Sequence, residues 1–174
     1  MKKTAVIKIL KNDGKGVLAT DTIYGLVGSA LSKKTVSRIY KLRKRDAKKP
    51  MIILIGSLND LKLFGIKING KLRKFLNKLW PGKISIILPC PNKKFSYLHG
   101  GTKSLAFRLP AKRSLLKLIR QTGPLVAPSA NINGLKPAKN IKEAKKYFGN
   151  KIDFYSDEGI IKALPSTLIE IKRL

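Results

Sequence analysis

The chain has 174 residues, enough for one domain with a substantial buried core. Its hydrophobic content of 43% excludes a disordered protein, and no stretch resembles a transmembrane span or a secretory signal, so the cytoplasm is the expected location. The formal net charge of +29 favours polyanionic partners, with nucleic acid the first candidate. Abundant Lys, Ile and Asn can equally reflect a coding bias, and both explanations of the charge stay open.

Helical and strand patterns alternate along the chain. Apolar residues recur at helical spacing, or follow a capping residue, in six segments: 4–10, 32–40, 57–64, 72–79, 115–119 and 141–148. Short apolar or alternating runs predict six strands: 17–19, 51–55, 84–88, 104–110, 124–127 and 166–171. Because helices alternate with strands, the expected fold class is α/β with a mixed sheet.

A dense basic run occupies residues 41–50 and leads directly into the apolar strand 51–55. Only eight of the 38 cations are Arg, and two of them, Arg43 and Arg45, fall in this run. A guanidinium is a planar fork that can grip phosphate or carboxylate with two hydrogen bonds, which an ammonium cannot do. We therefore interpret the run as an anion-binding site. The alternative is a solvated charged face.

Polar or charged residues stand at the ends of two other predicted strands and inside a third. Residues 20–26 place hydroxyls beside a glycine turn, and Ser129 and Asn131 lie in a turn bounded by Pro and Gly. Such positions at strand ends are suited to bind a ligand, although ordinary turn chemistry also explains these residue types. Arg108 lies inside an apolar run, where a charge needs a partner. It either pairs with an acid or binds an anionic ligand. Because the chain has only nine acids, we favour the ligand.

Several chemistries are excluded or disfavoured. Cys90 is the only cysteine, so an internal disulfide is excluded, and packing is its expected role. His99 is the only histidine and is placed in a loop, which argues against a Ser-His-Asp triad. Residues 65–72 match a P-loop but lack its Ser or Thr and its preceding strand. No protein-held metal is expected. An enzyme built from these residues would work by positioning and by stabilising anions.

Six short motifs together resemble the YrdC/TsaC family, the threonylcarbamoyl-AMP synthases. They occur in the family's order: Thr20-Asp21-Thr22-Ile23-Tyr24-Gly25-Leu26, the run ending Lys49-Pro50, Trp80-Pro81-Gly82, Phe107-Arg108-Leu109-Pro110, Pro128-Ser129-Ala130-Asn131 and Ser166-Thr167. The resemblance covers about the whole chain. It implies a single YrdC-like domain over residues 1–174, with a twisted mixed sheet and flanking helices around a basic cavity.

The resemblance also implies an activity. The family makes threonylcarbamoyl-adenylate and pyrophosphate from L-threonine, bicarbonate and ATP. ATP is then a substrate, with Mg²⁺ carried by the nucleotide. Partner proteins transfer the threonylcarbamoyl group to an adenosine of tRNA. Any RNA binding is expected to be weak, because the charge is high and stacking residues are few, and no membrane association is expected.

Carried over by position, the family motifs assign roles to ten residues. The K-x-R pair falls on Arg43 and Arg45, the implied catalytic residues, and S-x-N falls on Ser129 and Asn131; these four groups hold the ATP phosphates. The remaining substrate-binding residues are Lys49 and Ser104 on the nucleotide side, Thr22, Arg108 and Ser166 on the threonine side, and Tyr24 in the same motif as Thr22.

This sequence departs from the family pattern in places. Arg43 replaces the usual Lys, and Ala19 replaces a usual Pro. No hydroxyl follows Gly134, and the tail of longer members is missing, so a segment that closes the cavity is expected to be absent. Two alternatives stay open: an RNA-binding module of this fold, and a nucleotide-binding paralogue without synthase activity.

Overall fold

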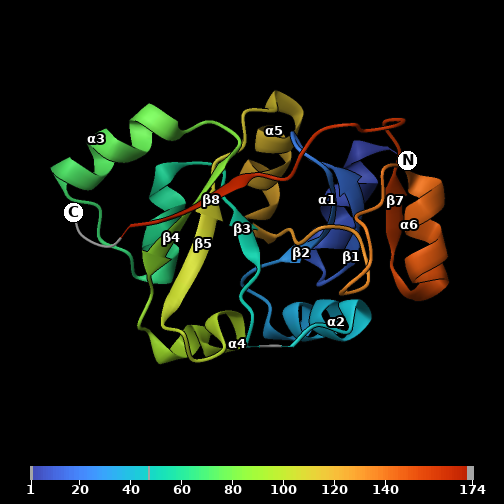
Figure 1. Ribbon diagram of the computed structural model, residues 1–174, viewed down its shortest axis with the longest axis horizontal. Helices are drawn as coiled ribbons and strands as arrows, with labels where there is room; N and C mark the ends of the chain where they lie inside the picture. Colours follow the sequence, from blue (N-terminus) through green and yellow to red (C-terminus); the bar gives the residue numbers. More distant parts are fainter. Residues whose placement is uncertain (1, 47, 172–174) are drawn as a thin grey trace.

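The computed structural model describes residues 2–46 and 48–171, so residue 47 of the basic run lies outside it. The described strands form one sheet with the order β7-β1-β2-β6-β3-β5-β4-β8 (Figure 1). The strands are β1 Lys15–Ala19, β2 Tyr24–Ser29, β3 Ile52–Leu54, β4 Ile84–Pro89, β5 Ser104–Arg108, β6 Leu125–Val126, β7 Phe154–Ser156 and β8 Thr167–Glu170.

Helices flank this sheet. They are α1 Lys3–Lys11, α2 Lys33–Arg43, α3 Gly70–Leu79, α4 Ser96–His99, α5 Arg113–Thr122 and α6 Ile141–Phe148, with 3-10 turns at Leu58–Phe64, Lys93–Phe95 and Gly149–Lys151. The strand pairs β1–β7, β3–β5 and β4–β8 are parallel, whereas β1–β2, β2–β6, β3–β6 and β4–β5 are antiparallel. The predicted mixed α/β sheet is confirmed.

Side chains that alternate along the strands separate the two faces of the sheet. Leu18, Val27 and Leu54 pack in one cluster with residues of α1 and α5. Their neighbours Val17, Leu26 and Ile53 pack in a second cluster with residues of α2 and α3. Gly28 lets α2 approach this second face closely, because a Cβ there would collide with Thr35 of α2.

Local signals explain both ends of α2. Ser32 caps its start, since the Ser32 hydroxyl accepts a hydrogen bond from the Thr35 amide at 3.2 Å. The helix ends at Arg43 because Lys44 takes a left-handed conformation with φ 49°. The basic run therefore leaves the helix at Arg43 and turns towards β3.

Two sequence expectations need correction. His99 does not lie in a loop: it ends α4 and is buried, and its Nδ1 atom accepts a hydrogen bond from the Gly101 amide at 3.1 Å. Strands β2 and β7 were not predicted: Gly25, expected in a turn, lies inside β2, and β7 forms one edge of the sheet. Residues 157–166, which we call the crossing segment, run from β7 to β8 at the opposite edge (Figure 1).

Candidate active site

Arg43 is the centre of the candidate site. Its side chain is buried, and its Nη2 atom donates hydrogen bonds to Ser129 Oγ at 3.1 Å and to Asn131 Oδ1 at 3.0 Å. Its Nε atom donates to the Asn131 backbone oxygen at 3.1 Å. Residues separated by more than 80 positions thus meet in one cluster, and the structure brings together the Arg of the basic run and the Ser and Asn of the later turn.

The electrostatic setting of Arg43 is unusual. All three acceptors that it contacts are uncharged. Burial, and secondly the neighbouring positive charge of Arg45, lower the pKa of Arg43 to about 10. The guanidinium is therefore still charged at neutral pH, and an incoming anion would relieve the cost of burying it.

Arg45 lies just beyond the end of α2 and is partly exposed. Its Nε atom donates to the Lys49 carbonyl at 3.2 Å, and its Nη2 atom is 3.5 Å from the Pro50 carbonyl. A hollow of about 400 Å³ beside it is also lined by Tyr40, Lys44 and Tyr97. These contacts with backbone carbonyls thus hold the Arg45 guanidinium at the rim of a basic hollow. The Lys49 side chain is exposed.

The turn between β1 and β2 holds Thr22, which is 2% exposed. Thr20 Oγ1 lies 2.7 Å from the Ile23 carbonyl and accepts hydrogen bonds from the Thr22 and Ile23 amides at 3.1 and 3.2 Å. Thr22 Oγ1 lies 3.0 Å from Thr20 Oγ1, and either hydroxyl could be the donor in that contact. Because a hydroxyl oxygen has two lone pairs, the Thr22 oxygen keeps acceptor capacity for a ligand in either case.

The Ser129 turn lies next to this hydroxyl turn. Ser129 forms a β-bridge with Gly25, and the Ala130 amide donates to the Tyr24 carbonyl at 2.9 Å. The start of β2 therefore connects Thr22 with the Arg43 cluster. This adjacency places hydroxyl groups beside guanidinium groups, an arrangement suited to an anionic ligand with polar substituents.

Arg108 has a partner that the sequence reasoning did not favour. Its Nη1 atom donates to Asp21 Oδ1 at 2.6 Å, and the two side chains are 3% and 7% exposed. Burial lowers the pKa of Arg108, and Asp21 partly offsets this effect. The expectation that the scarcity of acids leaves Arg108 without one is wrong, because chain folding brings Asp21 across 87 positions. Nε of Arg108 is buried without a partner among the described residues.

The remaining predicted site residues are more widely distributed. Ser104 begins β5 and Arg108 ends it, so they lie roughly 13 Å apart along the strand. Tyr24 is fully buried, and its hydroxyl contacts the Gly159 carbonyl at 2.8 Å and Asp157 Oδ1 at 3.2 Å. Ser166 Oγ lies 2.9 Å from the buried Ser85 hydroxyl. Tyr24 and Ser166 thus hold the two ends of the crossing segment.

Comparison with known proteins identifies the family. The Sua5/YciO/YrdC family model, described as telomere recombination, matches residues 8–173. The chain belongs to the Sua5/YciO/YrdC family. A threonylcarbamoyl-AMP synthase of Pyrococcus abyssi is 32% identical over 87% of this chain and 45% of that protein. A putative threonylcarbamoyl-AMP synthase of Methanocaldococcus jannaschii is 31% identical over 96% of this chain and 81% of that protein.

Solved structures of the family agree with this fold. Pyrococcus abyssi Sua5, in complex with L-threonine, superposes with a TM-score of 0.89 at 29% identity, over 98% of this chain and 51% of that one. Escherichia coli YciO superposes with a TM-score of 0.84 at 19% identity, over 98% of this chain and 84% of that one, which supports the fold alone. This Sua5/YciO/YrdC chain spans about half the length of the Pyrococcus protein.

The described residues were also compared with what a metal site and a membrane-spanning helix require. Among residues 2–46 and 48–171, no three His, Cys, Asp or Glu side chains are grouped so as to hold a metal ion. Within the same ranges, no helix has the length and apolar character needed to cross a membrane.

Asp21 was not among the residues assigned to the site from the sequence. Its position in a hydroxyl-rich turn at a strand end was the available signal. The basic cavity implied by the family resemblance stays a prediction, as do the ligand contacts of the ten assigned residues.

Proposed function

We propose that this chain is a threonylcarbamoyl-AMP synthase that uses L-threonine, bicarbonate and ATP. The observation that carries the proposal is the contact of Arg43 with Ser129 and Asn131 in a member of the Sua5/YciO/YrdC family. A relative with this fold is known in complex with L-threonine, which supports threonine as a substrate. Synthase names on relatives that match most of the chain support the reaction class.

The chemistry follows from the proposed substrates. The amine of threonine takes up bicarbonate and loses water, which gives an N-carboxylate. A carboxylate oxygen then attacks the α-phosphorus of ATP, and the bond to the bridging oxygen of pyrophosphate breaks. Negative charge grows on the departing phosphates. Arg43 and Arg45, with Ser129 and Asn131, would stabilise that charge more strongly in the transition state than in bound ATP.

The other assigned residues would divide between the two substrates. Lys49 and Ser104 would contact the nucleotide side, Thr22, Arg108 and Ser166 would line the threonine side, and Tyr24 would support the motif that carries Thr22. Mg²⁺ would arrive with the nucleotide, held by its phosphates. We further propose that residues 1–174 act as one YrdC-like domain in the cytoplasm, and that transferase proteins carry the product to tRNA.

Pyrophosphate release tests the proposal directly. Release should require ATP, threonine and bicarbonate together, and omission of any one should abolish it. Equal release with ATP alone would indicate a simple ATPase and reject the synthase. ATP binding without release under any condition would indicate the nucleotide-binding paralogue.

An RNA-binding module is the second candidate, favoured by the net charge of +29. Aromatic residues make up only 7% of the chain, which gives little material for base stacking. Sequence-selective RNA binding without any pyrophosphate release would favour this candidate over the synthase.

A further inference from the structure

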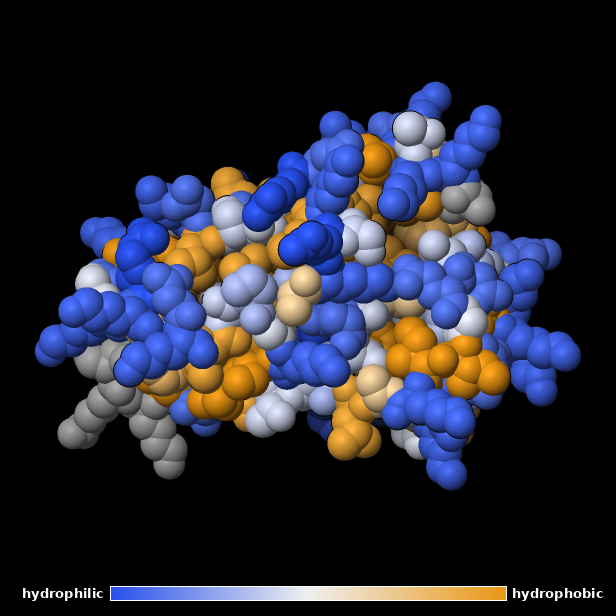
Figure 2. Space-filling view, turned by 90° about the horizontal axis from the view of Figure 1, so that it is seen from above, coloured by the Kyte–Doolittle hydropathy of each residue, from blue (hydrophilic) through white to orange (hydrophobic). Residues whose placement is uncertain are grey.

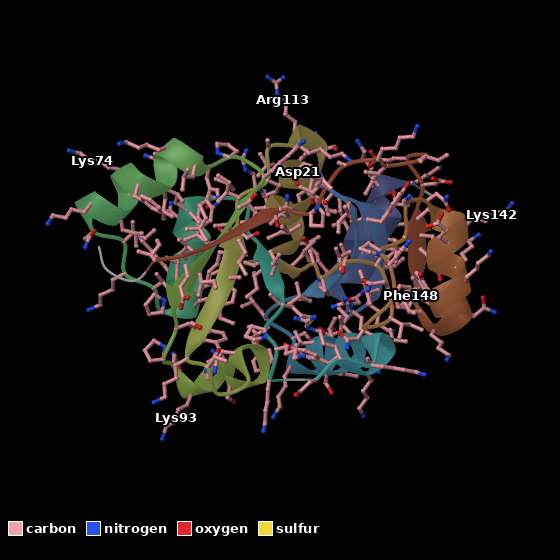
Figure 3. All side chains as sticks on the ribbon, viewed as in Figure 1. Asp21, Lys74, Lys93, Arg113, Lys142 and Phe148 are labelled. Carbon is pink, nitrogen blue, oxygen red and sulfur yellow. The ribbon has the colours of Figure 1, made fainter. Side chains whose placement is uncertain are left out.

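Asp21 makes contacts that connect two distant segments of the chain. Its Oδ1 atom accepts the hydrogen bond from Arg108 Nη1 at 2.6 Å, and its Oδ2 atom accepts one from the Ala111 amide at 3.0 Å. Lys112 adds a second connection, since its Nζ atom donates to the Ala19 carbonyl at 3.0 Å. Figure 3 shows Asp21 near the start of α5, below Arg113.

These contacts fix the distance between two residues of the proposed threonine side. Asp21 directly precedes Thr22 in the β1–β2 turn, and Arg108 ends β5. A single carboxylate therefore ties the Thr22 turn to both the guanidinium of Arg108 and the backbone that follows it. Loss of the Asp21 charge would release this arrangement without removing either Thr22 or Arg108.

The contact also fixes how the Arg108 guanidinium is turned. Asp21 accepts a hydrogen bond from Nη1 of Arg108, while Nε of Arg108 has no partner among the described residues. A guanidinium presents a second edge, formed by Nε and Nη2, that matches the two oxygens of a carboxylate. With Asp21 on Nη1, that edge is the one left for a ligand carboxylate.

Stability alone is a weak reason for this buried ion pair. Taking both charges out of water costs about as much as their attraction returns, so such pairs add little net stability. This chain has only nine acids, and one of them is buried here to 7% side-chain exposure. Orientation of a functional group is the better explanation.

We propose that Asp21 is a positioning residue for threonine recognition, acting through Arg108 and through the turn that carries Thr22. This inference rests on the proposed function. Asp21 itself would not touch the substrate. Its carboxylate would hold the Arg108 guanidinium so that the Nε–Nη2 edge faces the carboxylate of L-threonine.

The test is Asp21→Asn, which keeps the size of the side chain and removes its charge. The matched control is Asp153→Asn, because Asp153 also accepts a backbone N–H, from Lys15 at 2.8 Å, and pairs with a cation, Lys15 Nζ at 3.5 Å. Asp21→Asn should raise the KM and the calorimetric Kd for L-threonine by about ten- to a hundredfold. The KM for ATP should change less than about threefold. Asp153→Asn should change none of these values.

A double-mutant cycle with Arg108→Lys separates positioning from general structural support. If Asp21 acts through Arg108, adding Asp21→Asn to Arg108→Lys should raise the threonine Kd by less than about threefold. Independent effects that multiply in the double variant would overturn the inference, as would parental threonine affinity in Asp21→Asn. If Asp21→Asn does not fold, Asp21→Glu replaces it in the test, because it keeps the charge and moves it by one methylene. The same changes in the KM and Kd for L-threonine and in the KM for ATP are then expected.

The proposed function and this inference can fail separately. A parent protein that binds no threonine rejects both. A parent that binds threonine but releases no pyrophosphate rejects the synthase, while the threonine Kd values of the variants still decide the role of Asp21.

Discussion

Arg43 is a buried cation that is already hydrogen-bonded before any anion arrives. Its three contacts hold the Ser129 turn, and burial together with Arg45 lowers its pKa to about 10. The proposed role in phosphate binding needs the protonated form. That form is present below the pKa and is lost as the pH rises through it.

Arg43→Lys should therefore work near neutral pH but fail earlier at alkaline pH. Lys has an ordinary pKa of about 10.4, below that of Arg, and the same burial and the same Arg45 charge would lower it further. Turnover at pH 7 should stay within about tenfold of the parent, because a lysine keeps the charge but not the fork. The alkaline limb of the pH–rate profile should move towards neutral pH. An unchanged alkaline limb would show that the protonation of residue 43 does not limit the reaction.

Arg45 and Lys48 give a sharp test of the basic run. Both carry one positive charge, but only the Arg45 guanidinium is held, by its bond to the Lys49 carbonyl, at the edge of the hollow. Arg45→Ala should lower turnover by about a hundred- to a thousandfold, the cost of losing one preorganised donor. Lys48→Ala should lower it less than about threefold, since exposed charges are screened by salt.

The measurement is turnover of both variants at one salt concentration, after thermal melting has shown that both are folded. Equal turnover would make the run a charged surface and leave the phosphate site to Ser129 and Asn131.

Single side chains were predictable where a motif located them. The residue types of Arg43 and Arg45 pointed to an anion site, the family resemblance added Ser129 and Asn131 to it, and the structure joins Arg43 with Ser129 and Asn131. The partner of Arg108 was not predictable, because no periodicity or spacing relates residue 108 to residue 21. Pairing over such a distance is decided by the fold.

Helices and strands with a clear apolar pattern were predicted well. Helix α3 lies at 70–79 against a predicted 72–79, and β4 lies at 84–89 against a predicted 84–88. Helix α4 and strand β7, with four and three residues, are too short to display a period. The order of strands in the sheet also escaped prediction, because it depends on which apolar faces meet in space.

The crossing segment is an element without regular structure, and its first part is held by the Tyr24 phenol and by an ion pair between Lys112 and Glu158. The Tyr24 hydroxyl accepts a hydrogen bond from the Glu158 amide at 3.0 Å and contacts the Gly159 carbonyl at 2.8 Å. Burial raises the pKa of Tyr24, so this hydroxyl stays protonated and able to donate.

Tyr24→Phe should loosen the crossing segment. Loss of the hydroxyl should cost about 1 kcal/mol of stability and speed amide exchange at Glu158 and Gly159. Tyr155→Phe is the control, because the Tyr155 hydroxyl donates to the Gly149 carbonyl at 2.8 Å, outside this segment. Hydrogen exchange with thermal melting measures both effects. Parental exchange at Glu158 in Tyr24→Phe would mean that other contacts hold the segment.

For the molecule as a whole, charge is the dominant surface property. Figure 2 shows hydrophilic side chains over most of the visible face, with apolar surface between them. Exposed lysines lie on α2 and equally on α3. A net charge of +29 spread in this way attracts polyanions from many directions, without the stacking residues that select a base.

RNA binding should accordingly be weak, unselective and strongly dependent on salt. Each neutralised phosphate releases a counterion, so the logarithm of the affinity should fall linearly with the logarithm of the salt concentration. Fluorescence anisotropy with two RNAs of equal length and different sequence, over a salt series, measures both properties. Tight binding that is insensitive to salt and prefers one sequence would contradict this prediction.

Two triple variants test whether the positive charge binds RNA as a uniform background or through a defined site. Each variant replaces three exposed lysines of one helix by glutamate. The α2 variant changes Lys33, Lys34 and Lys41, and the α3 variant changes Lys71, Lys74 and Lys78. Because each variant removes the same charge, a background predicts that both weaken RNA binding and flatten the salt dependence by equal amounts. Pyrophosphate release should change little in the α3 variant, whose substitutions lie on a helix that carries none of the proposed site residues. A loss of RNA affinity confined to the α2 variant would instead locate a specific RNA surface beside Arg43 and Arg45, and the coding-bias explanation of the charge would fail on that face.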